Sequence, residues 1–276
     1  MTRVAVVSGA IVVMSASLVV AACGSDPVAT PAPTDAGLDA ETSIPTDSGP
    51  RDAQPEAAPS VFCKGLTVDF CGEFGGPTPG AGWDGVDARG GGAVALAAAT
   101  ETSAPSVLSS KLPAIATGSN AANAQVAKKL SLGGKKKITL SLAANFGSAP
   151  PSAGGSVTYF YVLIDGGGIA LLRRDTGWFL RVSRKNAGGD DGAELAVTSA
   201  PPLAKWARLK LEVTLANPAG SLRLDVDGAQ ALTQTLATHG DAQPLAEVTL
   251  ATGLTHGSGA IPAMDVAIDD VTLDLE

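Results

Sequence analysis

The chain contains few of the residues from which metal sites and many active sites are built. Its 276 residues include two His, three Cys and two Tyr, and aromatic residues make up 4% of it. A structural zinc ion usually takes four nitrogen or sulfur ligands at close spacings. His239 and His256 lie far along the chain from Cys63 and Cys71. We therefore predict no metal site and no cofactor, and interpret both histidines as loop residues.

Motifs of nucleophilic and phosphate-binding enzymes are also missing. The chain has no Gly-x-Ser-x-Gly segment. The glycine triplets 90–92 and 166–168 lack the Gly-Lys-Ser/Thr ending of a phosphate loop, so we interpret them as flexible turns. No catalytic residue is predicted on these grounds.

The charge balance argues against a nucleic-acid partner. The chain has 19 Lys+Arg against 27 Asp+Glu, for a net charge of −8, whereas nucleic-acid-binding domains carry a basic patch. One basic cluster stands out, and a solvated hairpin tip is its simpler interpretation. Contact with acidic polysaccharide or lipid headgroups is the alternative. The cluster consists of Lys128, Lys129, Lys135, Lys136 and Lys137.

The N-terminus has the pattern of a secretory signal. A short basic start, Met1-Thr2-Arg3, precedes an apolar run from Val4 to Val20. The run ends in Val20-Ala21-Ala22-Cys23, which resembles the lipobox of bacterial lipoproteins. That resemblance implies that residues 1–22 are removed and that Cys23 carries lipid such as palmitate, a membrane anchor. An ordinary signal peptide or an uncleaved anchor helix is the alternative.

Residues 23–60 read as a disordered tether behind that anchor. Seven of the 18 prolines fall here, together with seven acidic residues and the single base Arg51. Such a segment cannot bury enough apolar surface to offset its ordering entropy. Gly24 follows the lipidated cysteine in place of Asp, and in enteric lipoproteins this favours the outer membrane. We expect a lipid-anchored protein of the bacterial cell envelope.

The rest of the chain, residues 61–276, is predicted to be one all-β sandwich. Apolar and polar residues alternate from Trp206 to Leu215, as in a strand with one buried face. Asp227-Gly228 offers a two-residue hairpin turn, but this turn would send Leu232 and Leu236 to the outer face. Either the turn is longer or that face is covered. Other strands are predicted at 67–70, 93–97, 106–110, 125–132, 137–144, 158–164, 169–173, 178–183, 193–198, 246–251 and 264–275.

Three local features are predicted within this sandwich. Gly133-Gly134 is expected to turn a hairpin between 125–132 and 137–144. In the last strand the apolar residues change from even to odd positions near Asp269-Asp270, and one extra residue there would keep them on one face. This predicts a β-bulge. If Cys23 carries lipid, Cys63 and Cys71 are the two remaining cysteines, in an oxidising compartment. We expect them to form a disulfide. Two free thiols, or a metal pair without further ligands, are the alternatives.

The order of these features resembles the concanavalin A-like jelly roll, in its laminin-G-like bacterial branch. The resemblance rests on Trp206-Ala207-Arg208-Leu209, on Val226-Asp227-Gly228 and on the last strand, Ala267 to Leu273. It implies two packed antiparallel sheets that hold ligands on a concave face or at a calcium-containing rim. No loop here matches the calcium ligands. Some relatives hydrolyse glycans with paired carboxylates, but the Glu-x-Asp-x-x-Glu pattern is missing.

Carbohydrate binding by stacking requires exposed aromatic rings, and few candidates exist. Tyr159, Tyr161 and Trp178 lie in neighbouring predicted strands, with Arg174 and Arg181 nearby. The alternative is that these three rings pack in the core. We expect a non-catalytic module that binds carbohydrate or a surface protein. A divergent glycan hydrolase and a purely structural envelope protein are the other hypotheses.

Overall fold

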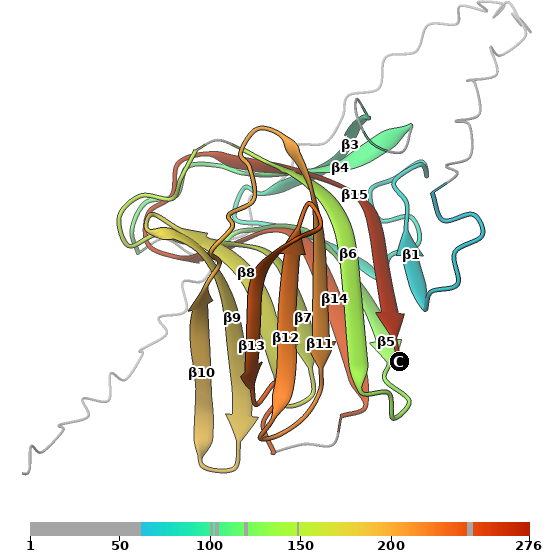
Figure 1. Ribbon diagram of the computed structural model, residues 1–276. Helices are drawn as coiled ribbons and strands as arrows, with labels where there is room; N and C mark the ends of the chain where they lie inside the picture. The colour runs from blue at the N-terminus through green and yellow to red at the C-terminus, as the bar shows by residue number, and fades with distance from the viewer. Residues whose placement is uncertain (1–61, 100–101, 103–104, 119–120, 148, 242–244) are drawn as a thin grey trace, which may run out of the picture. The chain divides into compact units, whose positions relative to one another are not determined.

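The computed structural model describes residues 62–276 apart from 100–101, 103–104, 119–120, 148 and 242–244. The signal segment, Cys23 and the tether lie outside the described residues. The described elements are all β-strands, which form two antiparallel sheets in a jelly-roll sandwich (Figure 1). Within these residues, no helix is long and apolar enough to cross a bilayer. The all-β jelly roll predicted from the sequence is confirmed.

Sheet A has eight strands and sheet B has seven. In sheet A the order is β13-β12-β11-β6-β15-β4-β3, with β1 also paired to β15. Its strands are β1 (Phe70–Gly72), β3 (Ala93–Ala98), β4 (Ser106–Leu112), β6 (Lys137–Phe146), β11 (Trp206–Thr214), β12 (Gly220–Val226), β13 (Ala229–Leu236) and β15 (Met264–Leu275). In sheet B the order is β10-β9-β8-β7-β14-β5-β2. Its strands are β2 (Gly85–Arg89), β5 (Asn123–Ser131), β7 (Ser156–Ile164), β8 (Gly167–Arg174), β9 (Gly177–Asn186), β10 (Gly189–Ala196) and β14 (Glu247–Ser258).

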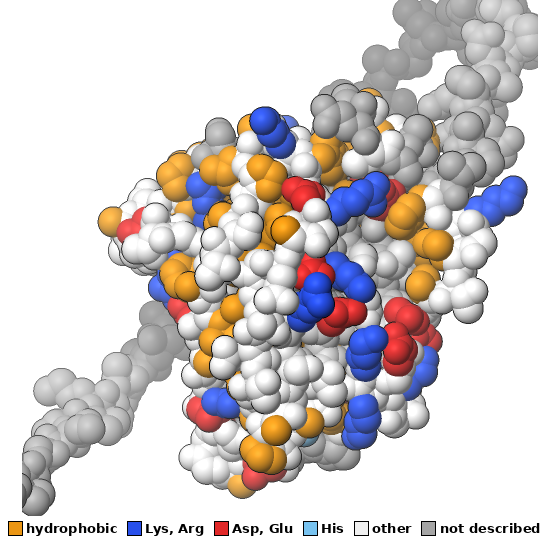
Figure 2. Space-filling model, in the orientation of Figure 1, with side chains coloured by type: hydrophobic (Ala, Val, Ile, Leu, Met, Phe, Trp, Pro, Cys, Tyr) orange, Lys and Arg blue, Asp and Glu red, His pale blue; other side chains and the backbone are white. Residues whose placement is uncertain are grey.

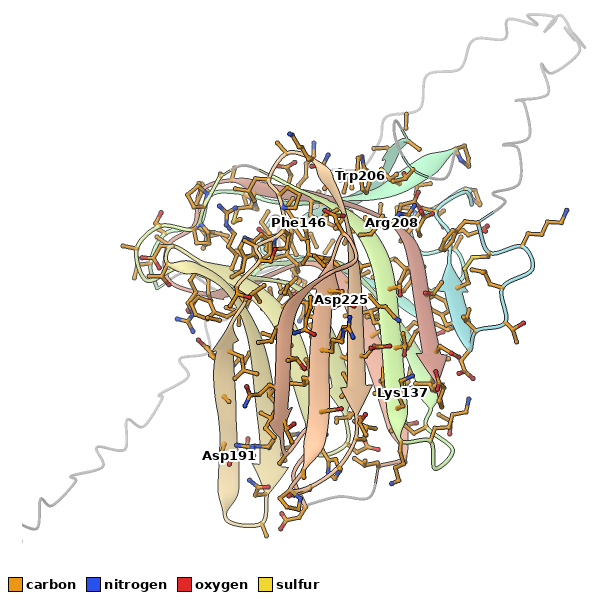
Figure 3. The ribbon with its side chains drawn as sticks, viewed as in Figure 1. Lys137, Phe146, Asp191, Trp206, Arg208 and Asp225 are labelled. Carbon is orange, nitrogen blue, oxygen red and sulfur yellow. A yellow bond between two sulfur atoms is a disulfide. The ribbon has the colours of Figure 1, made fainter. Side chains whose placement is uncertain are left out.

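The core lies between the sheets and takes one face of each central strand. In β11 the predicted inward row, which includes Leu209, Leu211 and Val213, is buried while Arg208 and Lys210 face outward. A ring cluster joins the two sheets near one end. Phe146 of sheet A (labelled in Figure 3) packs edge-on against Tyr159 and Trp178 of sheet B, with ring centroids 4.8 Å apart in each pair.

The expected hairpin between 125–132 and 137–144 is wrong. β5 belongs to sheet B, where it pairs with β14 and β2, and β6 belongs to sheet A, where it pairs with β11 and β15. Gly133 and Gly134 both have positive φ, but the turn that they form carries the chain from one sheet to the other. Periodicity fixes which face of a strand is buried, and it does not say which sheet the strand joins.

Bulges correct the parity of two strands. The predicted bulge at Asp269-Asp270 is confirmed, since the β15–β6 register shifts between Asp269 and Thr272. The β12–β13 turn consists of Asp227-Gly228 alone, because Val226 pairs with Ala229. Beyond this turn, Asp225 pairs with Gln230 and Leu224 pairs with Leu232. Ala231 therefore has no partner on β12 and forms a β-bulge. It brings Leu232 and Leu236 back to the core, so neither expected alternative for this turn holds.

The predicted pair Cys63 and Cys71 forms a disulfide, with the Cα atoms 5.8 Å apart. It closes a short loop directly before β1, which begins later than the strand expected at 67–70. The loop is fixed to the sandwich beside it, where Phe70 and Phe74 pack against the ring of Trp83.

Candidate functional site

The outward-facing side of sheet B, here called the open face, carries a row of residues set by the strand register. Tyr161 of β7, Ala170 of β8, Arg181 of β9 and Glu194 of β10 are successive cross-strand neighbours. On the other side of Tyr161 lies Ala251 of β14. Because neighbouring strands are about 4.8 Å apart, the backbones of Tyr161 and Arg181 are separated by about 10 Å. Ala170 keeps the floor low between these two longer side chains.

The open face is hollowed around this row. A pocket of about 360 Å³ is lined by Tyr161, Arg174, Arg181 and small or hydroxyl residues of β7 and β14. A second pocket, of about 400 Å³, continues from it through the shared residue Ser183. Its charged lining consists of Lys129, Asp165, Arg184, Lys185, Asp190 and Glu247. The two pockets lie on the same face and share Ser183, and together they are here called the groove.

A chain of hydrogen bonds holds Tyr161 in the groove. The Thr255 hydroxyl donates to Gln125 Oε1 at 2.5 Å, and Gln125 Nε2 donates to the Tyr161 hydroxyl oxygen at 2.9 Å. The side chain of Gln125 is buried beneath this network. Since Tyr161 accepts from Gln125, its own hydrogen can be donated to a molecule in the groove. Neither Gln125 nor Thr255 was predicted from the sequence. Each is a polar residue at an outward-facing position of its strand, and this is the one signal that could have pointed to it.

The β2 end of the open face carries a further basic group. Arg89 forms two hydrogen bonds to Asp87, at 2.6 and 2.5 Å. Asn123 donates to the same carboxylate at 2.9 Å. The Arg89 hydrogen bonds hold the pKa of Asp87 below its usual value, so this pair stays ionised at neutral pH.

Two arginines on the open face share one carboxylate. Arg174 Nη2 lies 2.7 Å from Glu194 Oε1, and Arg181 Nε lies 3.9 Å from the same oxygen. The predicted ligand-binding residues Tyr161, Arg174 and Arg181 therefore do lie together.

The prediction that Tyr159 and Trp178 are exposed for ligand stacking is wrong. Their exposed fractions are 2% and 6%, and both rings pack in the core cluster with Phe146. Trp178 shares the buried face of β9 with Leu180 and Val182. For Tyr159 the reason is a bulge in β7: Thr158 pairs with Leu172 and Phe160 with Leu171, so Tyr159 has no partner on β8. The extra residue turns both Tyr159 and Phe160 inward, and the simple alternation expected for this strand fails.

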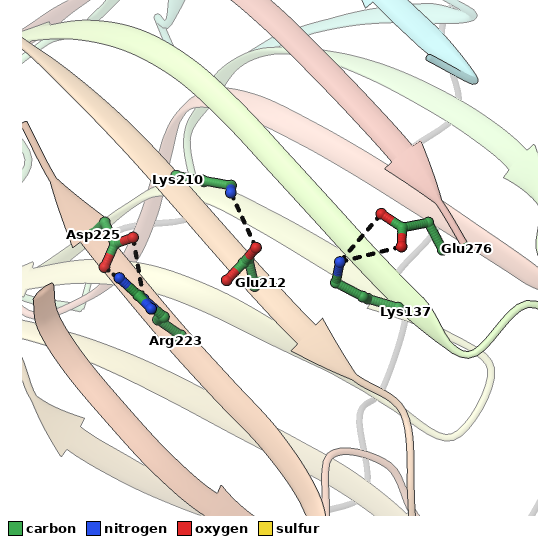
Figure 4. A network of polar contacts seen from close by, with 6 residues as sticks. All are labelled: Lys137, Lys210, Glu212, Arg223, Asp225 and Glu276. Carbon is green, nitrogen blue, oxygen red and sulfur yellow. Dashed lines mark hydrogen bonds and ion pairs between the residues drawn. The ribbon is translucent and has the colours of Figure 1, made fainter. Parts of the chain in front are cut away.

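The outer face of sheet A has a different character. Figure 2 shows acidic and basic side chains side by side across it, and Figure 4 shows its ion pairs. Arg223 pairs with Asp225 at 2.9 Å, and Lys210 with Glu212 at 3.0 Å. In Figure 3, Arg208 and Asp225 project from the neighbouring strands β11 and β12. They border a pocket of about 400 Å³ beside the disulfide loop.

The basic cluster is largely neutralised by its surroundings. Lys128 pairs with Asp84, Lys129 with Glu247, Lys135 with Asp69 and Lys137 with Glu276, all within 3.1 Å. This arrangement favours the solvated interpretation of the cluster. Within the part of the chain that the structure describes, no three His, Cys, Asp or Glu side chains are grouped closely enough to hold a metal ion.

Comparison with known proteins shows the fold and no family. No family model matches the chain, and no curated protein matches it. Among solved structures, an endo-β-1,4-glucuronan lyase from the fungus Trichoderma reesei superposes with a TM-score of 0.61 at 16% identity, covering 76% of this chain and 96% of that one. The cellulose-induced protein Cip1 gives a TM-score of 0.49 at 13% identity, covering 70% and 91%. The first likeness places the chain in the same jelly-roll fold.

The burial of Tyr159 makes a prediction about pH. Burial raises the pKa of this phenol to about 12, whereas an unfolded tyrosine has a pKa of about 10. Tyr159 therefore contributes stability that is fully present below about pH 10 and is lost as the pH rises towards 12. The chain has two tyrosines, so ultraviolet titration can follow each one. We expect a late ionisation step that Tyr159→Phe removes and Tyr161→Phe leaves. A titration in which both phenols ionise near pH 10, with circular dichroism showing an intact fold, would contradict this burial.

Proposed function

We propose that the open face of sheet B binds an acidic polysaccharide and that the chain carries this face on a lipid anchor at Cys23. The observation that carries the proposal is the groove in which Tyr161, Arg174 and Arg181 meet. An arginine recognises a carboxylate through two parallel hydrogen bonds. A tyrosine ring offers an apolar face to a sugar together with a polar tip. This combination suits a chain of uronic acid residues.

Two further features support a chain-like acidic ligand. The second pocket, which shares Ser183 with the first, is also lined by cations: Lys185, and Lys129 and Arg184, which are paired with Glu247 and Asp191. The structure with the TM-score of 0.61 is named as a lyase of glucuronan. Glucuronan is a polymer of a carboxylated sugar, so the ligand class inferred from the groove agrees with that name.

We expect Arg181→Ala to lower the affinity for a glucuronate oligosaccharide by at least about tenfold, since a hydrogen bond to a charged group contributes roughly 1.5–3 kcal/mol. Isothermal titration calorimetry measures this change. The matched control is Arg223→Ala. It also removes an arginine from an ion pair, here with Asp225, but on the outer face of sheet A. Equal losses of affinity in Arg181→Ala and Arg223→Ala would contradict the proposal. So would a wild-type protein that binds a neutral glucan as tightly as the glucuronate oligosaccharide.

A second candidate is β-eliminative cleavage of the same ligand, and the Gln125–Tyr161 hydrogen bond favours it. In such a reaction the proton on the sugar carbon next to the carboxylate is removed and the bond to the glycosidic oxygen breaks. A carbon–carbon double bond forms, and the departing oxygen takes a proton. Tyr161, held by Gln125 with its hydrogen available to the groove, can give this hydrogen to the departing oxygen and take the proton from the sugar carbon in its place, so that the phenol ends as it began. Ultraviolet absorbance by an unsaturated product that disappears in Tyr161→Phe is the result expected for this candidate.

Hydrolysis by two carboxyl groups is less well supported. That mechanism requires two acids flanking one bond at about 5–10 Å. The described residues that line the pocket around Tyr161 include no Asp or Glu. Glu194 lies beside this pocket, and its carboxylate is engaged by the two arginines.

The lipid anchor is tested separately from the ligand. Cys23→Ser removes the sulfur to which lipid would attach, so the protein is expected to lose labelled palmitate and to leave the membrane fraction of the producing bacterium. Cys63→Ser is the matched control, because Cys63 lies in the disulfide of the sandwich. This variant should still incorporate labelled palmitate. Palmitate incorporation that persists in Cys23→Ser would contradict the anchor.

A further inference from the structure

Glu194 occupies the position in which an anionic ligand would meet the arginines of the open face. It lies on β10, the edge strand of sheet B, directly opposite Arg181. Its Oε1 accepts from Arg174 at 2.7 Å and lies 3.9 Å from Arg181 Nε. One carboxylate oxygen on the edge strand therefore attracts both cations.

The Arg174 side chain extends across a neighbouring strand to reach Glu194. Arg174 belongs to β8, and its guanidinium reaches over β9 to contact β10. Its Nε is buried and makes no hydrogen bond. The contact with Glu194 thus holds an extended side chain flat across the sheet, where it borders the pocket.

The contacts with Glu194 are weak enough for a ligand to replace. The Glu194 and Arg174 side chains are each about one-third exposed, and that of Arg181 is 58% exposed. Ion pairs of this exposure contribute roughly 0.2–1 kcal/mol. A ligand carboxylate that binds both arginines must share them with Glu194 or displace it, and in either case it meets a like charge. Of the other acids on β10, Asp191 pairs with Arg184 at 2.8 Å, and Asp190 lines the second pocket.

We propose that Glu194 is an internal counter-anion that restrains Arg174 and Arg181 and competes with anionic ligands for them. It thereby limits the affinity of the open face and makes binding an exchange of one carboxylate for another. This inference rests on the proposed function for its ligand class, but the restraint on the arginines can be measured without any ligand.

The first test compares Glu194→Gln with the wild type for binding of a glucuronate oligosaccharide. The substitution keeps the side-chain shape and removes the competing charge, so the dissociation constant should fall roughly two- to fivefold. The matched control is Glu212→Gln, which makes the same change of charge in the Lys210–Glu212 pair on the outer face of sheet A. Its affinity should equal that of the wild type. Unchanged or weaker binding by Glu194→Gln, or an equal gain in Glu212→Gln, overturns the competition.

The second test needs no glycan. Phenylglyoxal modifies accessible arginines, and mass spectrometry of peptides gives the rate at each position. Arg174 and Arg181 should react severalfold faster in Glu194→Gln than in the wild type or Glu212→Gln, while Arg223 reacts at the same rate in Glu194→Gln and the wild type. Equal rates at Arg174 and Arg181 overturn the restraint. Faster modification without glycan binding in any variant would support the restraint and refute the proposed function.

Discussion

The structure depends on one constraint: every central strand gives one face to the apolar layer between two sheets. Leu211 and Val213 on β11 fill this layer from sheet A, and Val162 and Leu180 fill it from sheet B. Burial of such side chains is the main favourable contribution to folding. The opposite face of each strand is then free to carry polar groups. Ligand recognition must therefore be sought on the outer faces of the sheets or in the loops.

The two outer faces use this freedom differently. On sheet A, charged side chains such as Arg223 and Asp225 pair with their neighbours on the same face (Figure 4). On sheet B, the small residue Ala170 lies between Tyr161 and Arg181 and leaves room there. Arg174 and Arg181 on sheet B are themselves paired with Glu194, but they border one pocket together with Tyr161. A ring and two cations around one pocket offer a ligand both space and polar contacts, and for this reason we propose sheet B as the ligand surface.

Sequence alone predicts the parts of this arrangement that follow from local pattern. The alternation in β11 and the bulge at Asp269-Asp270 leave a direct trace in the order of apolar residues, and the Asp227-Gly228 dipeptide marks a turn. The inward turn of Tyr159 leaves none, because its bulge is fixed by packing against Phe146 and Trp178. The short strand Gly85–Arg89 was also missed. It is a mostly exposed edge strand, and only alternation with a buried face would have revealed it.

The candidate site was only partly predictable for the same reason. Arg174, Arg181 and Tyr161 are recognisable as possible ligand residues by type and by proximity in the sequence. Gln125 contacts Tyr161 from 36 residues away, and this contact exists because β14 brings β5 and β7 to its two sides. Strand order in a jelly roll arises from long-range pairing, which single-sequence periodicity does not encode.

Amide chemical shifts of the isotopically labelled protein, titrated with a glucuronate oligosaccharide, show which face of the sandwich the ligand contacts. If the open face of sheet B is the ligand surface, we expect shift changes concentrated on β7, β8, β9 and β14, around Tyr161 and Arg181. Changes confined to β6, β11 and β12, or to the disulfide loop, would place the ligand on sheet A and contradict the proposed function.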